Sequence, residues 1–330
     1  METKVSIVVT AMNSEHTLPR CLDSILAQTE KRLEIIVIFS ESDDDTPYII
    51  KDYQKKIKEE YPTIDFRYEK LRGGPGSRAR ARNRGADLVV APYFMYVDSD
   101  DYIEPTMCDA MYKEAMKSYN DIVLCDGYLY SEEVSYKEKV KFYTEFTGDC
   151  IAKNYIVSSY KPFAKLYRTE FWKKNGFKFL DFISYEDLAL IPALAACAIK
   201  IKYIPEHFYN YRHRPAVLHT TPEDYKATVK SIYTALAAME SEFNKAHNYM
   251  SYKEEIEFLY IKHMLYEASM LYFKIPDYEK ELDHLIDIID KKVSGFRTNI
   301  YFVIQNKTFK KACKLIYKGN YEKAKKVLGI

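Results

Sequence analysis

The chain has 330 residues, 47% of them hydrophobic, and its 49 Lys and Arg side chains nearly balance 48 Asp and Glu. A formal net charge of +1 excludes nucleic-acid binding through bulk positive charge, and no apolar run reaches the roughly 18 residues of a membrane span. Six scattered cysteines without a Cys-x-x-Cys pair give no sign of a zinc site or redox dithiol and are typical of a reducing cytoplasm.

Short apolar runs alternate with amphipathic segments over the N-terminal third of the chain. Val5–Val9 and Leu33–Phe39 are almost continuously apolar and rich in β-branched residues, which is typical of strands buried on both faces of a parallel sheet. The chain start therefore predicts a first buried strand rather than a signal peptide, and we expect a cytoplasmic protein. Further strands are expected around Phe66–Tyr68 and at Tyr93–Val97.

Three predicted helices separate these strands. The first is capped by Asn13 or Ser14 and has a buried stripe at helical spacing, formed by Leu18, Cys21, Leu22, Ile25 and Leu26. The others are expected over Pro47–Glu60 and from about Ser77 to Ala86. This order predicts an α/β fold, with a Rossmann-like, doubly wound, mainly parallel sheet and right-handed crossovers. Ligands of such sheets bind beyond the carboxyl ends of the strands.

The stretch Asp98-Ser99-Asp100-Asp101 directly follows the last of these strands. In an extended segment, side chains two residues apart point to the same side, so Asp98 and Asp100 can converge. Neighbouring carboxylates repel unless a proton or a metal neutralises them, and hard oxygen ligands favour Mg²⁺ or Mn²⁺. We therefore predict Asp98 and Asp100 as metal ligands. The alternative is a solvated acidic turn that caps the helix starting near Pro105.

A glycine-rich loop runs from Gly73 into a helix start that carries Arg78, Arg80, Arg82 and Arg84. Backbone amides at such a place favour a phosphate or another anion. Residues four apart share a helix face, so at most one pair of these arginines points readily into a single site. The glycine spacing matches neither a P-loop nor a dinucleotide fingerprint, and surface arginines after a turn are the alternative interpretation.

Two further clusters contain candidate functional residues. Glu186 and Asp187 begin an apolar helix; acids in a first helical turn complement the helix dipole without any chemistry, whereas one acid turned into a cleft would be a general base. In the segment Tyr209–Arg214, Arg212 and His213 are candidates for binding a phosphate or completing a metal shell.

Beyond about Pro222 the pattern changes to amphipathic helices, so we divide the chain into domains 1–215 and 216–330. Residues 307–326 hold eight lysines against one acid, Glu322. A basic amphipathic helix can lie on an anionic membrane surface, whereas a solvated lysine face on a packing helix is the commoner cause of this pattern. Both interpretations stay open, as does a role of this region in a homo-oligomer.

Several short motifs follow one another along the chain. They are Val5–Asn13, Arg20–Thr29, Glu34–Val37, Ala81–Gly85, Asp98–Asp101, Lys165–Arg168 and Glu186-Asp187. In order and spacing they resemble the family 2 glycosyltransferases of bacterial surface-polysaccharide synthesis. The resemblance covers residues 1–215 and leaves the C-terminal helices outside.

The resemblance implies an A-type glycosyltransferase fold, with a nucleotide-sugar across the sheet edge and a divalent metal held on its diphosphate by the aspartates matching Asp98 and Asp100. It also implies inverting chemistry, in which the carboxylate matching Asp187 deprotonates an acceptor hydroxyl that then attacks the anomeric carbon. The metal would neutralise charge on the leaving group. We expect the donor to be bound by Thr10, Asn13, Glu15, Glu41, Asp44, Gly76, Arg82, Asn83, Asp98, Arg212 and His213.

Two segments on the nucleobase side depart from the family pattern. Thr10–Asn13 reads Thr-Ala-Met-Asn where many members have Pro-Val-Tyr-Asn, and Phe39–Ser42 reads Phe-Ser-Glu-Ser where they have Asp-Asp-Gly-Ser. The usual base-reading acid is thus displaced, with Glu41 or Asp44 as substitutes. This departure bears on uridine specificity more than on the reaction class.

We therefore expect a metal-dependent inverting glycosyltransferase that uses Mg²⁺ or Mn²⁺, takes a UDP-sugar and extends a cell-surface glycan or lipid-linked acceptor. Its location would be cytoplasmic or peripheral on the inner face of the plasma membrane, and its C-terminal region would serve the acceptor, an oligomer or the membrane surface. One alternative is a nucleotidyltransferase, although Thr10–Glu15 lacks the glycine-rich loop expected there. The other is a non-catalytic nucleotide-sugar-binding partner of a second transferase, against which the intact Asp98, Asp100 and Asp187 argue.

Overall fold

The apolar runs of the N-terminal third form parallel strands, as their β-branched composition predicts. The structure is a computed structural model that describes residues 2–131, 133, 135–143, 151–181, 184–213 and 221–330. Strands β1 (Val5–Ala11), β2 (Leu33–Ser40), β3 (Asp65–Leu71) and β4 (Tyr93–Asp98) lie in the order β3-β2-β1-β4, and all their pairings are parallel. Their carboxyl ends therefore meet at one edge of the sheet.

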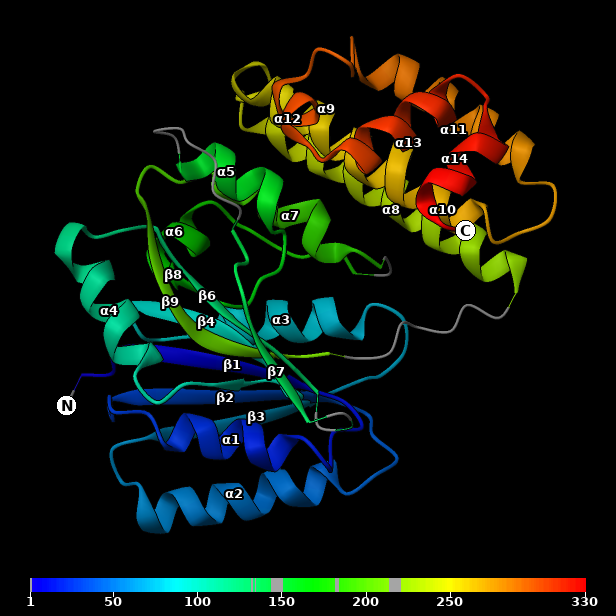
Figure 1. The fold of residues 1–330 in the computed structure, drawn as a ribbon. Helices are drawn as coiled ribbons and strands as arrows, with labels where there is room; N and C mark the ends of the chain where they lie inside the picture. Colours follow the sequence, from blue (N-terminus) through cyan, green and yellow to red (C-terminus); the bar gives the residue numbers. More distant parts are fainter. Residues whose placement is uncertain (1, 132, 134, 144–150, 182–183, 214–220) are drawn as a thin grey trace. The chain divides into compact units, whose positions relative to one another are not determined.

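Three helices connect these strands: α1 (Leu18–Leu26), α2 (Thr46–Glu60) and α3 (Ser77–Leu88). In Figure 1, α1 and α2 lie on one side of the strands and α3 on the other, which is the doubly wound arrangement. Helix α3 approaches the sheet closely because Gly85 lacks a side chain: a Cβ atom there would lie 2.2 Å from Cγ1 of Val8.

The second half of the sheet mixes strand directions. It adds β5 (Tyr102–Ile103), β6 (Ile122–Ser131), β7 (Tyr136–Val140), β8 (Lys165–Arg168) and β9 (Ile201–Arg212), with helices α4 (Met107–Ser118), α5 (Ile151–Ser158) and α6 (Thr169–Lys174) between them. The full order is β3-β2-β1-β4-β8-β6-β9-β5, with β7 on β6. Strand β8 is antiparallel to both β4 and β6, whereas β6 and β9 are parallel. The predicted α/β class is confirmed, and the antiparallel additions make the sheet mixed.

The pairing of β6 with β9 is irregular at Cys125–Gly127, where β9 contributes extra residues. Beyond the irregularity, Gly127 lies opposite Tyr209. The strands approach so closely there that a Cβ atom on Gly127 would lie 2.0 Å from the carbonyl oxygen of Tyr209. Such bulges re-aim the side chains that follow them, and the segment re-aimed here is the Tyr209–Arg212 end of β9.

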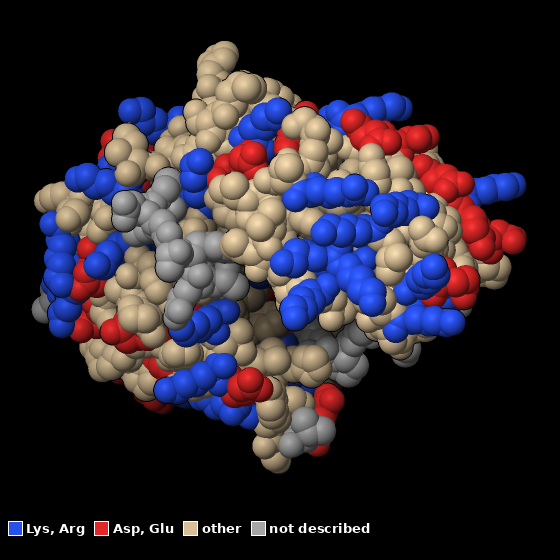
Figure 2. Space-filling view, turned by 45° about the horizontal axis from the view of Figure 1, so that its top comes forward, with Lys and Arg blue, Asp and Glu red and all other residues tan. Residues whose placement is uncertain are grey.

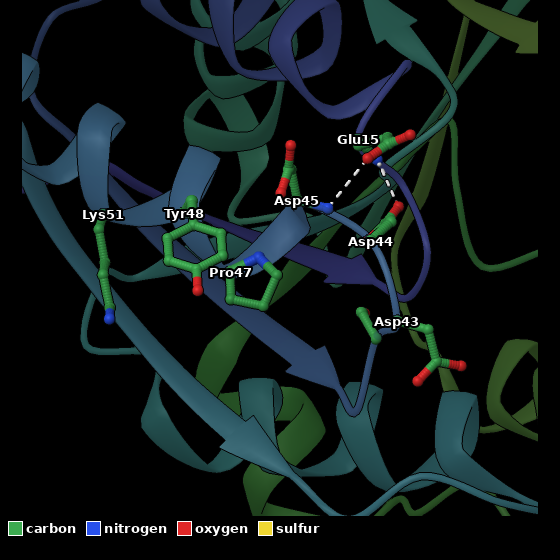
Figure 3. A pocket seen from close by; sticks show the side chains of 8 residues that line it. Glu15, Asp43, Asp44, Asp45, Pro47, Tyr48 and Lys51 are labelled. Atoms are coloured by element: carbon green, nitrogen blue, oxygen red, sulfur yellow. Dashed lines mark hydrogen bonds between the residues drawn. The ribbon is translucent and has the colours of Figure 1, made fainter.

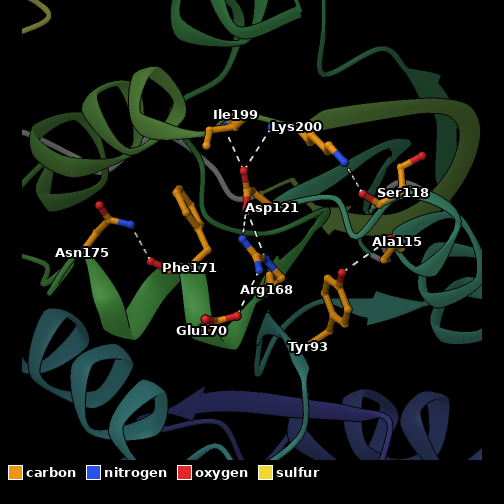
Figure 4. A network of polar contacts seen from close by, with 10 residues as sticks. All are labelled: Tyr93, Ala115, Ser118, Asp121, Arg168, Glu170, Phe171, Asn175, Ile199 and Lys200. Atoms are coloured by element: carbon orange, nitrogen blue, oxygen red, sulfur yellow. Dashed lines mark hydrogen bonds and ion pairs between the residues drawn. The ribbon is translucent and has the colours of Figure 1, made fainter.

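A partly buried ion pair joins the end of β8 to the starts of β6 and β9 (Figure 4). Asp121 accepts hydrogen bonds from the side chain of Arg168 at 2.5 Å and from the backbone amides of Ile199 and Lys200 at 2.8 and 3.0 Å. Arg168 also contacts Glu170 at 3.1 Å. Arg168 thus has a structural contact in this fold, because it ties the end of β8 to the residue that precedes β6.

The described residues pack as two units, Met1–Phe182 with Cys197–Pro215 and Ile183–Ala196 with Ala216–Ile330. The second unit is helical. It contains α7 (Glu186–Cys197), α8 (Pro222–Lys245), η1 (Tyr249–Tyr252), α9 (Lys253–Tyr260), the π-helix η2 (Ile261–Ala268), α10 (Ser269–Tyr272), α11 (Tyr278–Lys292), α12 (Ile300–Ile304), α13 (Lys307–Tyr317) and α14 (Tyr321–Leu328). The sequence boundary between residues 215 and 216 stays a prediction. Across the described ranges, no helix is long and apolar enough to cross a membrane.

Candidate functional site

The aspartate cluster forms a turn at the carboxyl end of β4, as predicted. Asp98 is the last residue of the strand, and the amide of Asp101 donates to its carbonyl at 3.0 Å. The amide of Ser99 donates to the carbonyl of Thr10 at 3.2 Å, which ties the turn to the end of β1. The side chain of Asp98 is 21% exposed, whereas Asp100 and Asp101 are buried.

Asp98 is held as a carboxylate by positive charge from α3. Nη2 of Arg82 lies 3.2 Å and 3.3 Å from its two oxygens, and the Thr10 hydroxyl donates to Oδ1 at 3.2 Å. Burial alone would raise the pKa of Asp98, but the charges of Arg82 and Arg78 and these hydrogen bonds outweigh it and lower the pKa below its ordinary value. Asp98 thus carries a negative charge at neutral pH.

Asp101 has the opposite environment. Burial, followed by the nearby charges of Asp100 and Asp98, raises the pKa of Asp101. Its two oxygens accept from the Tyr209 hydroxyl at 2.6 Å and from the backbone amide of Arg212 at 2.8 Å. Asp101 therefore attaches the end of β9 to the turn.

The same turn is also fixed by Tyr130 of β6. The Tyr130 hydroxyl donates to the carbonyl of Asp100 at 2.6 Å, and the amide of His213 donates to the carbonyl of Tyr130 at the same distance. Arg212 is the last residue of β9 and His213 follows it, so both lie at the strand end that contacts the aspartate turn. The two halves of the sheet meet at this place, although their residues are far apart in sequence.

The loops after β1 and β2 hold one another at the same edge. Asn13, which has a positive φ of 48°, accepts from the amide of Asp43 at 3.0 Å. Glu15 is bonded to two neighbouring residues of the other loop: its amide donates to the Asp44 carboxylate, and its carboxylate accepts from the amide of Asp45, each at 2.9 Å. Partial burial would raise the pKa of Asp44, but its hydrogen bonds from the Thr46 side chain and from the backbone amides of Glu15 and Thr46 outweigh burial and lower this pKa.

An open pocket of about 590 Å³ lies against these loops, lined by Glu15, Ser42, Asp43, Asp44, Asp45, Pro47, Tyr48 and Lys51 (Figure 3). Its lining is acidic, which suits hydroxyl groups and amines better than phosphates. Nearby, the carboxylate of Glu41 accepts from the amide of Gly73 at 3.3 Å, so the loop after β2 also contacts the glycine-rich loop.

The glycine-rich loop is held in place by Arg80 of α3. Gly76 adopts the left-handed conformation, with φ of 73°, and begins α3. Arg80 donates to the carbonyls of Pro75 and Gly73 at 2.6 and 3.0 Å. The side-chain amide of Asn83 donates to the carbonyl of Phe179 and accepts from the Phe179 backbone amide, each at 2.8 Å. Of the predicted donor-binding residues on α3, Arg82 lies at the aspartate turn and Asn83 braces a neighbouring loop.

The structure therefore brings Thr10, Arg82, Asp98, Asp100, Arg212 and His213 together around one turn, and Asn13, Glu15, Glu41, Asp44 and Gly76 into the adjoining loops of the same unit. Asp187 and Glu186 belong to the helical unit, where both are buried at the start of α7. Their roles stay predictions, as do those of the donor-binding set.

Asp98 and Asp100 are the side chains that could hold a divalent metal. Among the residues that the structure describes, no group of three or more His, Cys, Asp or Glu side chains forms a metal site by itself. Two hard carboxylate ligands fit Mg²⁺ or Mn²⁺, because these ions usually retain waters and share substrate phosphates rather than occupy an all-protein cage. The donor set is thus suited to a metal that arrives with a diphosphate.

Tyr209 is the site residue that sequence reasoning missed. It begins the Tyr209–Arg214 segment, in which the sequence predicts only Arg212 and His213 as ligand-binding residues. In the sequence, Tyr209 and Tyr211 are two residues apart and therefore predicted on one face of a strand, which is a weak sign of a shared role. Only the structure, with the irregular pairing of β6 and β9, shows that the Tyr209 hydroxyl reaches Asp101.

The sequence and the fold are similar to those of known proteins. Residues 6–185 match the profile of glycosyl transferase family 2. The chain is 28% identical to glycosyltransferase GlyA of Streptococcus pneumoniae over 170 residues, which are 52% of this chain but 22% of that protein. It is 26% identical over 307 residues to the cholesterol galactosyltransferase of Borreliella burgdorferi, covering 87% of this chain and 83% of that protein.

Among solved structures, residues 1–349 of Staphylococcus aureus TarS in complex with UDP have a similar fold. The TM-score is 0.71 at 18% sequence identity, and the match covers 98% of this chain and 90% of that chain. The likeness extends beyond the sheet into the C-terminal helices, because it spans nearly the whole chain.

Proposed function

Because the chain belongs to glycosyl transferase family 2, we propose that it moves a sugar from a nucleotide-diphosphate sugar to a hydroxyl group of a cell-surface glycan or lipid-linked acceptor, with inversion at the anomeric carbon. The observation that carries the proposal is the turn at the end of β4. There, an ionised Asp98 and the neighbouring Asp100 lie beside the cationic Arg82 and the end of β9.

The charge pattern at this turn suits a diphosphate bound with a cation. Asp98 and Asp100 would hold Mg²⁺ or Mn²⁺, which would supply charge neutralisation for the leaving nucleoside diphosphate. Arg82 balances the charge of Asp98 before any ligand arrives. Arg212, 25% exposed in its side chain, is a candidate for contacting the phosphates directly, because a guanidinium group matches phosphate geometry.

The donor is proposed to be a UDP-sugar. Support comes from the likeness of the fold to TarS, whose structure was solved with UDP. The acids of the two adjoining loops would face the nucleoside, where Glu41 or Asp44 would replace the displaced base-reading acid. Asp44 has the lowered pKa that keeps it an acceptor for hydroxyl or amide hydrogens.

Asp187 is the proposed general base. A carboxylate in this role removes the proton of the acceptor hydroxyl as that oxygen attacks the sugar. Glu186 would be structural, since a first-turn acid also stabilises α7 through the helix dipole. A lipid-linked acceptor is supported by the relative named as a cholesterol galactosyltransferase.

The proposal is tested by screening nucleotide-sugars for thermal stabilisation of the protein, with Mn²⁺ and with a chelator. A ligand that binds only the folded state raises the melting temperature by mass action. We expect UDP-sugars to stabilise the protein in Mn²⁺. Release of pyrophosphate when a nucleoside triphosphate and a sugar 1-phosphate are supplied together would instead identify a nucleotidyltransferase.

A further inference from the structure

Helix α12 presents aliphatic side chains to solvent. Ile300, Val303 and Ile304 are 55%, 50% and 60% exposed, and their spacing of three and four residues places them on one face of the helix. The intervening Tyr301 and Phe302 are buried, and Phe302 packs against Phe296 with ring centroids 5.2 Å apart. The helix is therefore anchored by two aromatic residues while its outer face is aliphatic.

Helix α13 follows after two residues and is strongly basic. Its lysines at 307, 310, 311 and 314, with Lys318 at its end, fall within roughly 100° of the helix circumference. The buried side chains Phe309, Ala312, Cys313 and Ile316 occupy the opposite face. The helix is thus amphipathic, with a face made only of lysines pointing away from the core of its unit.

These lysines do not contribute to folding through ion pairs. Within the ranges that the structure describes, the ion pairs of residues 300–330 are limited to that of Lys325 with Glu322, at 3.5 Å. Lysines four apart on a helix repel one another, and Lys307 at the positive end of the helix dipole is unfavourably placed. A solvated lysine face is common on a packing helix, so the lysines alone do not indicate a ligand, and the aliphatic side chains beside them are needed to do so.

The aliphatic and basic side chains form one surface. Nζ of Lys310 donates to the carbonyl of Val303 at 2.8 Å, which brings α13 directly beside the end of α12. Figure 2 shows Lys and Arg side chains gathered closely together on the face that it views. We call Ile300, Val303, Ile304, Lys307, Lys311 and Lys314 the basic-aliphatic face.

We propose that the basic-aliphatic face docks the helical unit onto an anionic lipid bilayer. Lysines near such a surface are attracted by its negative potential, and exposed aliphatic side chains beside them can enter the boundary between headgroups and acyl chains. A soluble polyanion would satisfy the lysines but leave the three aliphatic side chains in water. The docking does not depend on the proposed sugar transfer, although a lipid-linked acceptor would be found at the same surface.

The test is co-sedimentation of the full chain with vesicles of phosphatidylcholine mixed with phosphatidylglycerol, and with vesicles of phosphatidylcholine alone. We expect binding to the anionic vesicles that weakens as salt rises. Replacing Lys307, Lys311 and Lys314 by Gln should lower the partition coefficient about 10²-fold, from the attraction of each lysine near the surface. The matched control replaces Lys51, Lys55 and Lys58, which have the same spacing on the exposed face of α2, and should bind as the wild type does.

A second variant separates a bilayer from a soluble polyanion. Replacing Ile300, Val303 and Ile304 by Ser should weaken binding to anionic vesicles while binding to inorganic polyphosphate stays unchanged. All six substituted positions are exposed or half-buried, so the variants should keep the far-ultraviolet circular dichroism of the wild type. Deleting residues 307–330 is a poorer test because it would uncover buried side chains.

Insertion is measured independently with Val303→Trp. Compared with the wild type, in which the buried Trp172 emits, the additional emission should shift to the blue on anionic vesicles and be quenched by brominated lipids. The proposal is overturned by any of three results: equal binding to both kinds of vesicle, equal loss in the α2 control, or full vesicle binding by the serine variant. The last result would show that the lysines bind anions by charge alone, without insertion of the aliphatic side chains.

Discussion

Tyr209 and Asp101 lie 108 residues apart in sequence, yet the Tyr209 hydroxyl donates to the Asp101 carboxylate at 2.6 Å. The same hydroxyl accepts from the backbone amide of Asp98 at 3.2 Å. One side chain on β9 thus fixes both ends of the turn that carries the proposed metal ligands. The pair couples the mixed half of the sheet to its parallel half.

Replacing Tyr209 by Phe should lower the free energy of unfolding by about 1–3 kcal/mol, because buried polar groups at both ends of the turn lose their partner. Nucleotide-sugar binding should weaken as well, since Asp98 is no longer held. Urea unfolding and donor titration measure the two effects. Tyr128→Phe is the control, because the Tyr128 hydroxyl has no hydrogen bond to the described residues. Equal losses for the two variants would show that the Tyr209 hydroxyl has no special role.

Replacing Asp100 by Asn should weaken nucleotide binding in Mn²⁺ far more than in chelator, because a neutral amide oxygen is a poorer ligand for a hard cation. The measurement is the shift in melting temperature with added nucleotide in each condition. Asp109→Asn on α4, where Asp109 pairs with Lys113 at 2.7 Å, should behave as the wild type. If the wild type itself binds nucleotide equally well with and without metal, the metal has no part in donor binding.

Replacing Asp187 by Asn distinguishes a general base from a helix-dipole acid. Loss of a base should lower the transfer rate on the order of 10²–10⁴-fold while donor affinity and melting temperature stay near wild type. Loss of a dipole acid should cost roughly 0.3–1 kcal/mol of stability and leave turnover almost intact. Glu186→Gln is the control and should be the milder change for transfer. A rate above about a tenth of wild type in Asp187→Asn contradicts the assignment.

Glu30 provides a pH-dependent contribution to stability. It accepts from Lys4 at 2.6 Å and from Nε of Arg32 at 3.0 Å. Burial alone would raise the pKa of Glu30, but these hydrogen bonds lower it from 4.5 to about 2. Because the folded pKa lies below the unfolded one, the stabilisation is present above the unfolded value and is lost as pH falls through the folded value.

Glu30→Gln should therefore destabilise the protein at neutral pH by only about 1 kcal/mol, because Arg32 is partly exposed and solvent screens the ion pair. The difference in free energy of unfolding between wild type and variant should shrink as pH falls from 4.5 toward 2. Urea unfolding across this range measures it. A difference that stays constant with pH would mean that the Glu30 charge contributes nothing to stability.

The parallel half of the fold could be predicted from sequence because its signals are local. Val5–Val9 and Leu33–Phe39 are apolar on both faces, and the strand before Asp98 ends where the carboxylates begin. The aspartate turn and its place at the carboxyl edge follow from that order alone. Family membership, inferred from the order of short motifs, is confirmed by the match over residues 6–185.

The other half depends on pairings that no local pattern records. The contact of Tyr209 with Asp101 requires extra residues in β9 opposite Cys125–Gly127, and hydrophobic periodicity does not report such a shift. The contact of Asn83 with the backbone of Phe179, 96 residues away, is of the same kind, while its role at the donor stays a prediction. The π-helix Ile261–Ala268 is equally hidden, because its apolar residues fit an ordinary helical stripe.

Gly127 has no functional group, yet it limits which variants of this protein can work. A methyl group there would collide with the carbonyl of Tyr209 and push β9 away from the strand that positions it. A mutational library aimed at new donors or acceptors would target charged and aromatic positions around the turn and treat Gly127 as neutral. Such a library should instead keep Gly127 constant, since any replacement would damage every design at once, whatever sugar it was meant to accept.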